Sequence, residues 1–143
     1  MPKINPYLNF MGNTEEAFEF YRSVFGGEFA QLMRFREMPD AGNIPATEAN
    51  LIMHVALPIG DAGVLMGTDA LESMGHKLTI GDNISLAVSA DSKEEADRLF
   101  GGLSAGGAVD LEMQDMFWGA YFGMLRDRFG VHWMVSYESR PGA

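Results

Sequence analysis

The sequence contains two segments that repeat one pattern about 80 residues apart. The first spans residues 4–27 (INPYLNFMGNTEEAFEFYRSVFGG) and the second spans residues 84–107 (ISLAVSADSKEEADRLFGGLSAGG). Each begins with a short apolar run, crosses a polar turn into Glu-Glu-Ala, continues with helical spacing and ends at Gly-Gly. Repetition on this scale is typical of a duplicated structural unit. We therefore expect the chain to consist of two copies of one module.

Each repeat carries the signals of one amphipathic helix. Asn13 and Glu16 in the first copy, and Ser92 and Glu95 in the second, have the spacing of a capping box. Apolar side chains follow at three- and four-residue spacing, which predicts one buried stripe on each helix. The aromatic residues of these stripes are therefore expected in the core.

Three strand-like runs follow each helix. They cover roughly 28–37, 49–59 and 64–69 in the first copy, and roughly 108–114, 116–125 and 131–137 in the second. Each copy therefore reads β-α-β-β-β, which predicts an α+β fold. One sheet with a single helix leaves its other face uncovered. We expect two tandem βαβββ modules that form a curved, barrel-like mixed sheet with the helices on the outside and a ligand site on the concave side.

The chain has 143 residues, a length typical of one domain. We expect a single domain over 1–143, with the first module at about 1–70, a linker at 71–82 and the second module at about 83–138. The linker carries His76, which is expected to be a solvated side chain rather than a ligand.

Composition limits the classes of function. The formal net charge is −10, from 20 acidic and 10 basic residues. Nucleic acids and anionic membranes bind clustered Lys and Arg, which this sequence lacks, so neither is expected as a partner. The longest apolar run is too short for a membrane span and no secretion leader is evident, so we expect a cytoplasmic protein. There is no cysteine, and 11 methionines supply adaptable apolar surface.

His54 lies in the middle of the strand-like run NLIMHVAL. Strand alternation places Ile52 and Ala56 on its face, and Met53 and Val55 on the other. Two interpretations remain open. The side chain is either a buried histidine with one hydrogen-bond partner, or a donor or general base in a pocket.

Asp69 closes the next run, VLMGTDA, and alternation places it with Leu65 and Gly67. Its carboxylate either orients His54 or caps the turn that follows, as Asp does at most such positions. His54 and Asp69 are therefore the candidate catalytic residues.

The C-terminal run DRFGVHWMVSYE places His132 and Met134 on one face of a strand, opposite bulky apolar side chains. A metal bound by His132 would have Met134 as its neighbouring ligand, and Met is a soft ligand that suits copper(I). His132 is therefore expected to be a polar residue of the pocket wall rather than a metal ligand. In the preceding run, Trp118 shares a face with Phe122. Gly123 beside them indicates either close packing with a neighbour or space kept for a ligand.

Nearly the whole chain resembles one protein family. The stretches that carry the resemblance are NPYLNFMGNTEEAFEFYRSVFGGE, IMHVALPIGDAGVLMGTDA and MQDMFWGAYFGMLRDRFGVHWMVSYE. Together with the duplicated β-α-β-β-β pattern, they resemble the PhnB-like subgroup of the vicinal oxygen chelate superfamily, which includes glyoxalases, extradiol dioxygenases and bleomycin resistance proteins. The resemblance implies this superfamily's fold, a homodimer and a small-molecule pocket.

The resemblance also implies where metal-using relatives hold their metal, namely on the first and last strand of each module. The corresponding positions are Gly67 and Met134 on the last strands, and Asn5 to Tyr7 and Ser85 on the opening strands. None of these positions carries His or Glu. The usual metal site is therefore expected to be absent.

Two functions follow as hypotheses. The first is a small-molecule-binding protein without metal or cofactor, a homodimer with a cleft lined by methionine and aromatic side chains. Its candidate ligand-binding residues are Trp118, Phe122, His132, Met134 and Ser85. The alternative is a metal-dependent lyase, isomerase or dioxygenase that holds a divalent metal ion at a non-standard site made by His54, Asp69 and His132. This alternative predicts that His54→Ala abolishes metal uptake and leaves the fold intact.

Overall fold

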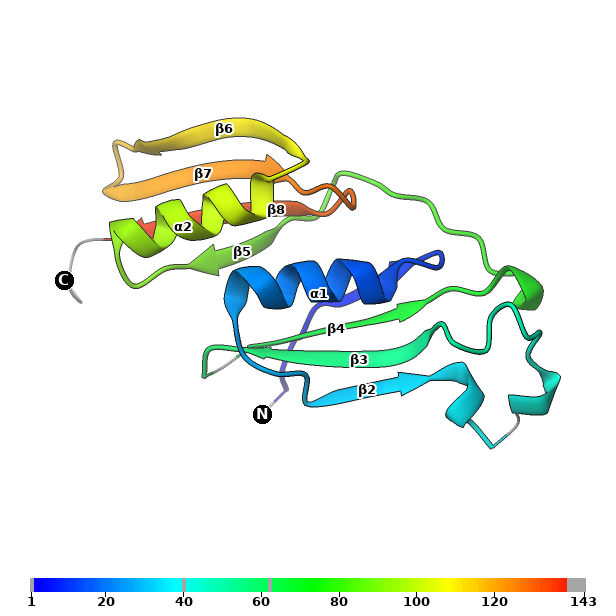
Figure 1. Cartoon of the computed structure of the whole chain (residues 1–143). Coiled ribbons are helices and arrows are strands. Elements are labelled where there is room, and N and C mark those ends of the chain that lie inside the picture. The colour runs from blue at the N-terminus through cyan, green and yellow to red at the C-terminus, as the bar shows by residue number, and fades with distance from the viewer. Residues whose placement is uncertain (1, 40, 62, 139–143) are drawn as a thin grey trace. The chain divides into compact units, whose positions relative to one another are not determined.

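The structure, a computed structural model, describes residues 2–39, 41–61 and 63–138 (Figure 1). The chain divides into two units, Met1–Thr79 and Ile80–Ala143. Within the described residues, each unit contains one α-helix and one four-stranded sheet. In this part of the chain, no helix has both the length and the apolarity needed to cross a bilayer.

The first unit contains, in chain order, β1 (Tyr7–Phe10), α1 (Thr14–Phe25), β2 (Gln31–Arg34), β3 (Ile52–Ile59) and β4 (Gly63–Asp69). Its sheet has the strand order β1-β4-β3-β2, in which β1 runs parallel to β4 and the other neighbours are antiparallel. Short 3-10 helices lie at η1 (Phe35–Glu37), η2 (Ala41–Asn43) and η3 (Glu72–Met74).

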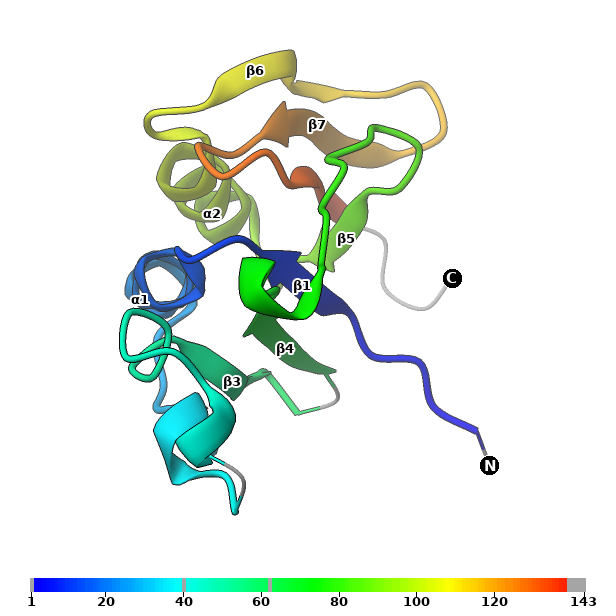
Figure 2. The same cartoon turned by 90° about the vertical axis from the view of Figure 1, so that its right-hand side faces the viewer.

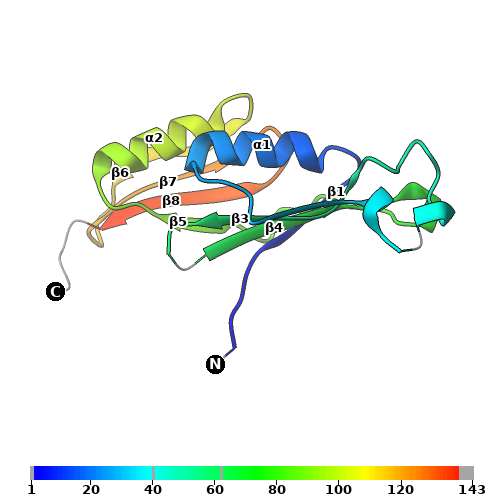
Figure 3. The same ribbon diagram turned by 60° about the horizontal axis from the view of Figure 1, so that its bottom comes forward.

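The second unit repeats this topology with β5 (Leu86–Ser89), α2 (Lys93–Ser104), β6 (Ala108–Asp115), β7 (Ala120–Arg126) and β8 (His132–Glu138). Its strand order is β5-β8-β7-β6, with β5 parallel to β8. In each unit the helix covers one face of the sheet and leaves the opposite face, here called the open face, without a helix (Figure 3). The predicted α+β fold of two tandem βαβββ modules is confirmed, and its mixed sheet is built as two four-stranded sheets.

Three strands are shorter than the sequence indicates. The run expected at 49–59 begins only at Ile52. The run expected at 28–37 pairs only over Gln31–Arg34, because the chain then turns into η1. The run expected at 116–125 begins at Ala120, because the four residues before it form a tight turn. In that turn the Gly119 N–H donates to the Met116 carbonyl oxygen at 3.0 Å.

Each helix buries one apolar stripe against its own sheet. The buried stripe residues are Ala17, Phe18, Tyr21 and Val24 on α1, and Ala96, Leu99, Phe100 and Leu103 on α2. α1 packs on β3 and β4, and α2 packs on β6, β7 and β8. The aromatic residues of both stripes belong to the core, as their spacing predicts.

The N-termini of the two helices are capped in different ways. At α2, the Ser92 hydroxyl accepts from the Glu95 N–H at 3.0 Å, and the Glu95 carboxylate accepts from the Asp91 N–H at 2.8 Å. This arrangement is close to the predicted capping box. At α1, the Asn13 side chain makes no capping hydrogen bond, so the predicted cap is wrong there.

Asp69 supplies the cap of α1 from the end of β4. Its Oδ1 accepts from the N–H groups of Gly12 (2.9 Å) and Thr14 (3.1 Å) and from the Thr14 hydroxyl (2.7 Å). Its Oδ2 accepts from the Ile52 N–H at 2.8 Å. The positive end of the helix dipole also favours a carboxylate here. Asp69, which is 2% exposed, therefore joins the start of α1 to β3 and β4.

A glycine on each sheet lets a phenylalanine of the helix pack directly on the strand. A Cβ atom on Gly67 of β4 would lie 2.6 Å from the Phe18 ring, and one on Gly123 of β7 would lie 2.8 Å from the Phe100 ring. Of the two interpretations of Gly123, the structure supports close packing.

Gly67→Ala is expected to lower the free energy of unfolding by about 1–3 kcal/mol, because the added methyl group overlaps the buried Phe18 ring. Gly101→Ala is the matched control. Gly101 lies exposed within α2 with open space around an added Cβ, so its replacement is expected to raise stability by about 0.5–1 kcal/mol. Urea unfolding measures both, and an unchanged midpoint for Gly67→Ala would contradict the packing described.

Asp69→Asn is expected to lower the free energy of unfolding by about 2–3 kcal/mol, because the amide nitrogen cannot accept from the backbone N–H groups that face it. Asp110→Asn, at an exposed position of β6, is the control and is expected to change stability by less than about 0.5 kcal/mol. Thermal melts followed by circular dichroism compare them. Equal melting temperatures would show that the Asp69 bonds do not support the fold.

Candidate functional site

The register of β1 and β4 decides which side chains reach the open face of the first sheet. Leu8 pairs with Gly67, and an added Cβ on Gly67 would meet the Phe18 ring, so this pair faces α1. Side chains alternate along a strand. The pairs that reach the open face are therefore Tyr7 with Met66, and Asn9 with Thr68.

A β-bulge at the start of β3 changes the alternation there. The residue of β2 before Arg34 pairs with His54, and Arg34 pairs with Ile52, so Met53 is an extra residue between them. Both guanidinium NH groups of Arg34 bond the Glu15 carboxylate of α1, at 2.8 and 2.9 Å, which places Arg34 and its partner Ile52 on the helix-covered side. The prediction that Ile52 and His54 share a face is wrong, because the bulge separates them.

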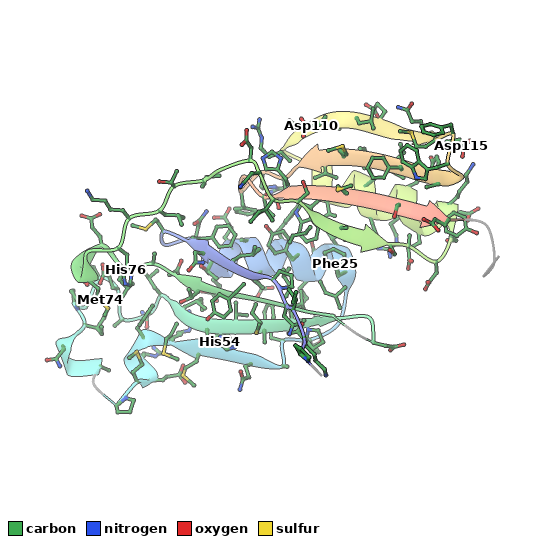
Figure 4. The ribbon with its side chains drawn as sticks, turned by 180° about the vertical axis from the view of Figure 1, so that it is seen from behind. Phe25, His54, Met74, His76, Asp110 and Asp115 are labelled. Carbon is green, nitrogen blue, oxygen red and sulfur yellow. The ribbon has the colours of Figure 1, made fainter. Side chains whose placement is uncertain are left out.

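His54 bonds to Tyr7 on the open face. Figure 4 views the first sheet from this side. The Tyr7 hydroxyl lies 3.0 Å from His54 Nδ1, and the two ring centroids are 5.7 Å apart. Burial raises the pKa of Tyr7, so its phenol stays protonated at neutral pH. When Tyr7 donates this bond, the neutral His54 ring carries its proton on Nε2, which leaves an N–H donor for a ligand.

The structure does not bring the two catalytic candidates, His54 and Asp69, together. Asp69 belongs to the helix-covered side of β4, and its oxygens accept from Gly12, Thr14 and Ile52. Of the two roles expected for Asp69, capping is the one its bonds support, although the segment capped is the start of α1 rather than the following turn.

A hollow of about 520 Å³ opens at one end of the first sheet. The loops that carry η1 and η3 lie at this end (Figure 2). Its apolar lining comes from Phe35, Met38, Met53, Ala70, Met74 and Leu78, and its polar lining from Asn9, Thr68, Asp69, His76 and Lys77. The lining includes part of the open face, through Asn9, Thr68 and Met53. Its volume is in the range of small-molecule sites.

The segment from residue 70 to 78, here called the strap, forms one wall of this hollow. The Leu71 N–H donates to His76 Nδ1 at 2.8 Å. Ser73 is bonded to the Glu48 carboxylate through both its N–H, at 3.3 Å, and its hydroxyl. Met74 and His76 lie together at this end of the unit (Figure 4). His76 is exposed, as expected, but its ring also holds the strap in place.

Sequence reasoning missed most of the hollow. Phe35 and Met38 belong to η1 and its C-terminal end, Met53 to β3 and Met74 to η3, and no local pattern unites these three segments. The signal available was the high methionine count, which indicated an adaptable apolar surface without placing it.

On the second sheet, three of the predicted ligand-binding residues reach the open face. Gly123 faces α2, so its neighbour Phe122 faces away from the helix. Phe122 pairs with Ser136 across β7 and β8, and Met134 and His132 lie at two-residue steps from Ser136 along β8. Phe122, Met134 and His132 therefore share one face, which alternation had predicted only for Met134 and His132.

The other two predicted ligand-binding residues lie at the borders of this sheet. Trp118 belongs to the turn before β7, where its ring centroid is 6.0 Å from that of Phe122 and 5.1 Å from that of Phe117. Trp118 is 52% exposed and Phe117 is 97% exposed. Ser85 directly precedes β5 and is half-buried. None of the five residues predicted on the second module lines the hollow of the first.

Asp127, in the acidic turn before β8, holds that turn in place. Its Oδ1 accepts from the N–H groups of Phe129 (2.8 Å) and Val131 (3.0 Å), and its Oδ2 accepts from Trp133 Nε1 at 2.8 Å. Asp127 is 2% exposed. The turn is therefore tied to the core through Trp133.

The residues present do not fit the divalent metal that the superfamily resemblance implies. Gly67 was expected at a ligand position, but it faces α1, and its open-face neighbours are Met66 and Thr68. On β8 the implied ligand position holds Met134, a thioether that does not suit hard divalent ions. Within the described residues, no group of three or more His, Asp or Glu side chains is placed to hold a metal ion.

Comparison with known proteins gives a family match over nearly the full chain. Residues 2–136 match the family described as 3-demethylubiquinone-9 3-methyltransferase. Protein YjdN of Escherichia coli K12 is 32% identical over 141 residues, which cover 93% of each chain.

Solved structures show the same fold. Protein PA1353 from Pseudomonas aeruginosa is similar with 38% identity and a TM-score of 0.84, over 96% of this chain and 98% of that one. The PhnB protein from Bacillus cereus has 29% identity and a TM-score of 0.76, over 95% and 99%. A glyoxalase/bleomycin resistance protein/dioxygenase family enzyme from Burkholderia phytofirmans PsJN, at 19% identity and a TM-score of 0.61 over 92% and 95%, shares the fold.

Tyr7→Phe is expected to shift the neutral His54 ring from the Nε2–H tautomer to a mixture of tautomers, because Nδ1 loses its donor. Stability should fall by less than about 1 kcal/mol, since Tyr7 is 44% exposed. Long-range nitrogen–proton NMR correlations of the histidine rings report the tautomer, with His132 of the second module as an internal control. Unchanged His54 signals would contradict the assigned direction of this bond.

Proposed function

We propose that this chain, which belongs to the PhnB-like family described as 3-demethylubiquinone-9 3-methyltransferase, is a small-molecule-binding protein. It shares the fold of a glyoxalase/bleomycin resistance protein/dioxygenase family enzyme. The proposed site is the methionine-lined hollow of the first module and the adjoining open face. The ligand is a small organic molecule with an apolar body.

The observation that carries this proposal is the composition of the hollow. Three methionines, Met38, Met53 and Met74, line it together with Phe35, in a volume of about 520 Å³. Methionine side chains are unbranched and polarizable, so they adapt to the shape of an apolar body. Small-molecule sites commonly combine such a lining with a few polar groups that fix orientation.

His54 is the polar group proposed to orient the ligand from the sheet. His54 follows Met53 directly in the sequence. The Tyr7 hydroxyl is hydrogen-bonded to His54 Nδ1, so the His54 Nε2–H is the donor left for a ligand. A ligand that extends from the hollow along the open face and carries a carbonyl or hydroxyl oxygen would accept this hydrogen bond. The ring of a ubiquinone precursor, which the family description names, carries oxygens of this kind.

Binding without a metal is also part of the proposal. At the last-strand positions where the resemblance implies ligands, the chain has Gly67, which has no side chain and faces α1, and Met134, which carries a thioether. The alternative, a metal-dependent lyase, isomerase or dioxygenase, needed His54 and Asp69 at one site. Because Asp69 caps α1 instead, that alternative has lost one of its three proposed ligands.

Two methionine variants test which module binds. A panel of small aromatic alcohols, quinones and short-chain ketones is screened by thermal shift, and the affinity of each hit is measured by calorimetry. Met53→Ser is expected to weaken the hits about tenfold, because it removes about 1.5 kcal/mol of apolar contact. Met134→Ser, on the open face of the second module, is the matched control and should change affinity less than about twofold.

Three outcomes would contradict the proposal. The reverse ranking of the two variants would assign the ligand to the second module. Tight binding of S-adenosylmethionine, lost in Met53→Ser, would favour the methyl transfer in the family's description. Retention of Fe(II), Mn(II), Ni(II) or Zn(II) near one ion per chain, abolished by His54→Ala in a folded protein, would support the metal-dependent alternative.

A further inference from the structure

The polar groups of the hollow are not equally free to bind a ligand. The Thr68 hydroxyl already donates to the carbonyl oxygen of Met53 at 2.7 Å. The Asp69 oxygens already accept from Gly12, Thr14 and Ile52. Of the five polar lining residues, these two are therefore committed to the protein. The charged or titratable groups that remain both lie on the strap.

The first of these two remaining titratable groups is His76. Its Nδ1 accepts from the Leu71 N–H at 2.8 Å, and a backbone N–H only donates. The neutral His76 ring must therefore carry its proton on Nε2. The hydrogen bond from Leu71 to His76 within the strap therefore leaves the His76 Nε2–H as a donor, and His76 lines the hollow.

The second of these two groups is Lys77. It lines the same hollow, and within the described residues its ammonium forms no ion pair. The nearby carboxylates do not supply one. The Glu48 carboxylate is bonded to Ser73. Glu72 lines a second hollow of about 580 Å³ at the strap, and among the described residues it forms no ion pair with Lys77. In a chain of net charge −10, an exposed cation without an acidic partner is available to an anion.

We infer that the hollow takes an amphipathic carboxylate, with its apolar body among the methionines and its carboxylate on the His76–Lys77 wall. The inference rests on the proposed function, because it names the ligand class of the same hollow. A carboxylate only accepts hydrogen bonds, so it matches one neutral N–H and one ammonium donor, and charge-assisted bonds of this kind are stronger than neutral ones. A single cation on the wall favours a single negative charge.

Matched pairs of ligands test the charge. Octanoate is compared with octanamide, and cinnamate with cinnamamide, because each pair shares its apolar body and differs in charge. Each carboxylate is expected to bind about fivefold more tightly than its amide at low salt, and this preference should shrink at 0.5 M salt, where the exposed charges are screened. Isothermal calorimetry on the full chain at pH 7.5 gives both affinities.

Lys77→Gln is the test variant and Lys3→Gln is its control. Lys3 is an exposed lysine of the same unit that does not line the hollow. Lys77→Gln is expected to reduce the carboxylate preference to about twofold or less while leaving amide affinity unchanged, and Lys3→Gln is expected to preserve the preference. Octanoate should also shift the Nε2–H resonance of His76 in NMR spectra. A carboxylate preference that survives Lys77→Gln would overturn the inference.

Failure of the inference and failure of the proposed function give different results. Equal affinity for carboxylate and amide in the unchanged protein, with both weakened by Met53→Ser, would overturn only the charge assignment. No binding of either series, or binding insensitive to Met53→Ser, would overturn the hollow as the site. Urea unfolding of Lys77→Gln, which alters an exposed side chain, is expected to match that of the unchanged protein.

Discussion

The carboxylate of Asp69 accepts hydrogen bonds from Gly12, Thr14 and Ile52, and the site of the first module depends on these bonds. They fix the first turn of α1 over the sheet and hold the start of β3 beside the end of β4. A buried carboxylate is costly unless donors satisfy it, and here four donors do so. Asp69 therefore both caps α1 and positions β3, the strand that carries Met53 of the hollow.

Asp69 and its neighbour Thr68 hold the β3 bulge from opposite faces of the sheet. Asp69 accepts from the Ile52 N–H on the helix-covered side, and the Thr68 hydroxyl donates to the carbonyl oxygen of Met53 at 2.7 Å, with the Ile52 carbonyl oxygen at 3.3 Å. The bulge sends Ile52 into the core while Met53 lines the hollow and His54 bonds on the open face. An unbulged strand would have placed Ile52 and His54 on one face and Met53 on the other.

The two modules share a topology but use their buried aspartates differently. Asp69 bonds to distant segments and so shapes the wall of a hollow. Asp127 bonds within its own turn and to Trp133, which secures the entry to β8. The two modules therefore share one topology, while the polar interactions of their buried aspartates differ.

Local patterns in the sequence determined the repeated modules, the buried helical stripes and the Ser92 cap, because these features depend on residues within a few positions of one another. Tertiary structure decided the cap of α1, the faces of β3 and the hollow. Asn13 had the right spacing for a cap, yet Asp69, 55 residues from Thr14, forms it. Alternation along β3 assumed an unbroken strand, but the bulge is defined by pairing with β2 and held by β4. The lining of the hollow comes from separate segments, so only their folded arrangement brings the methionines together with His76 and Lys77.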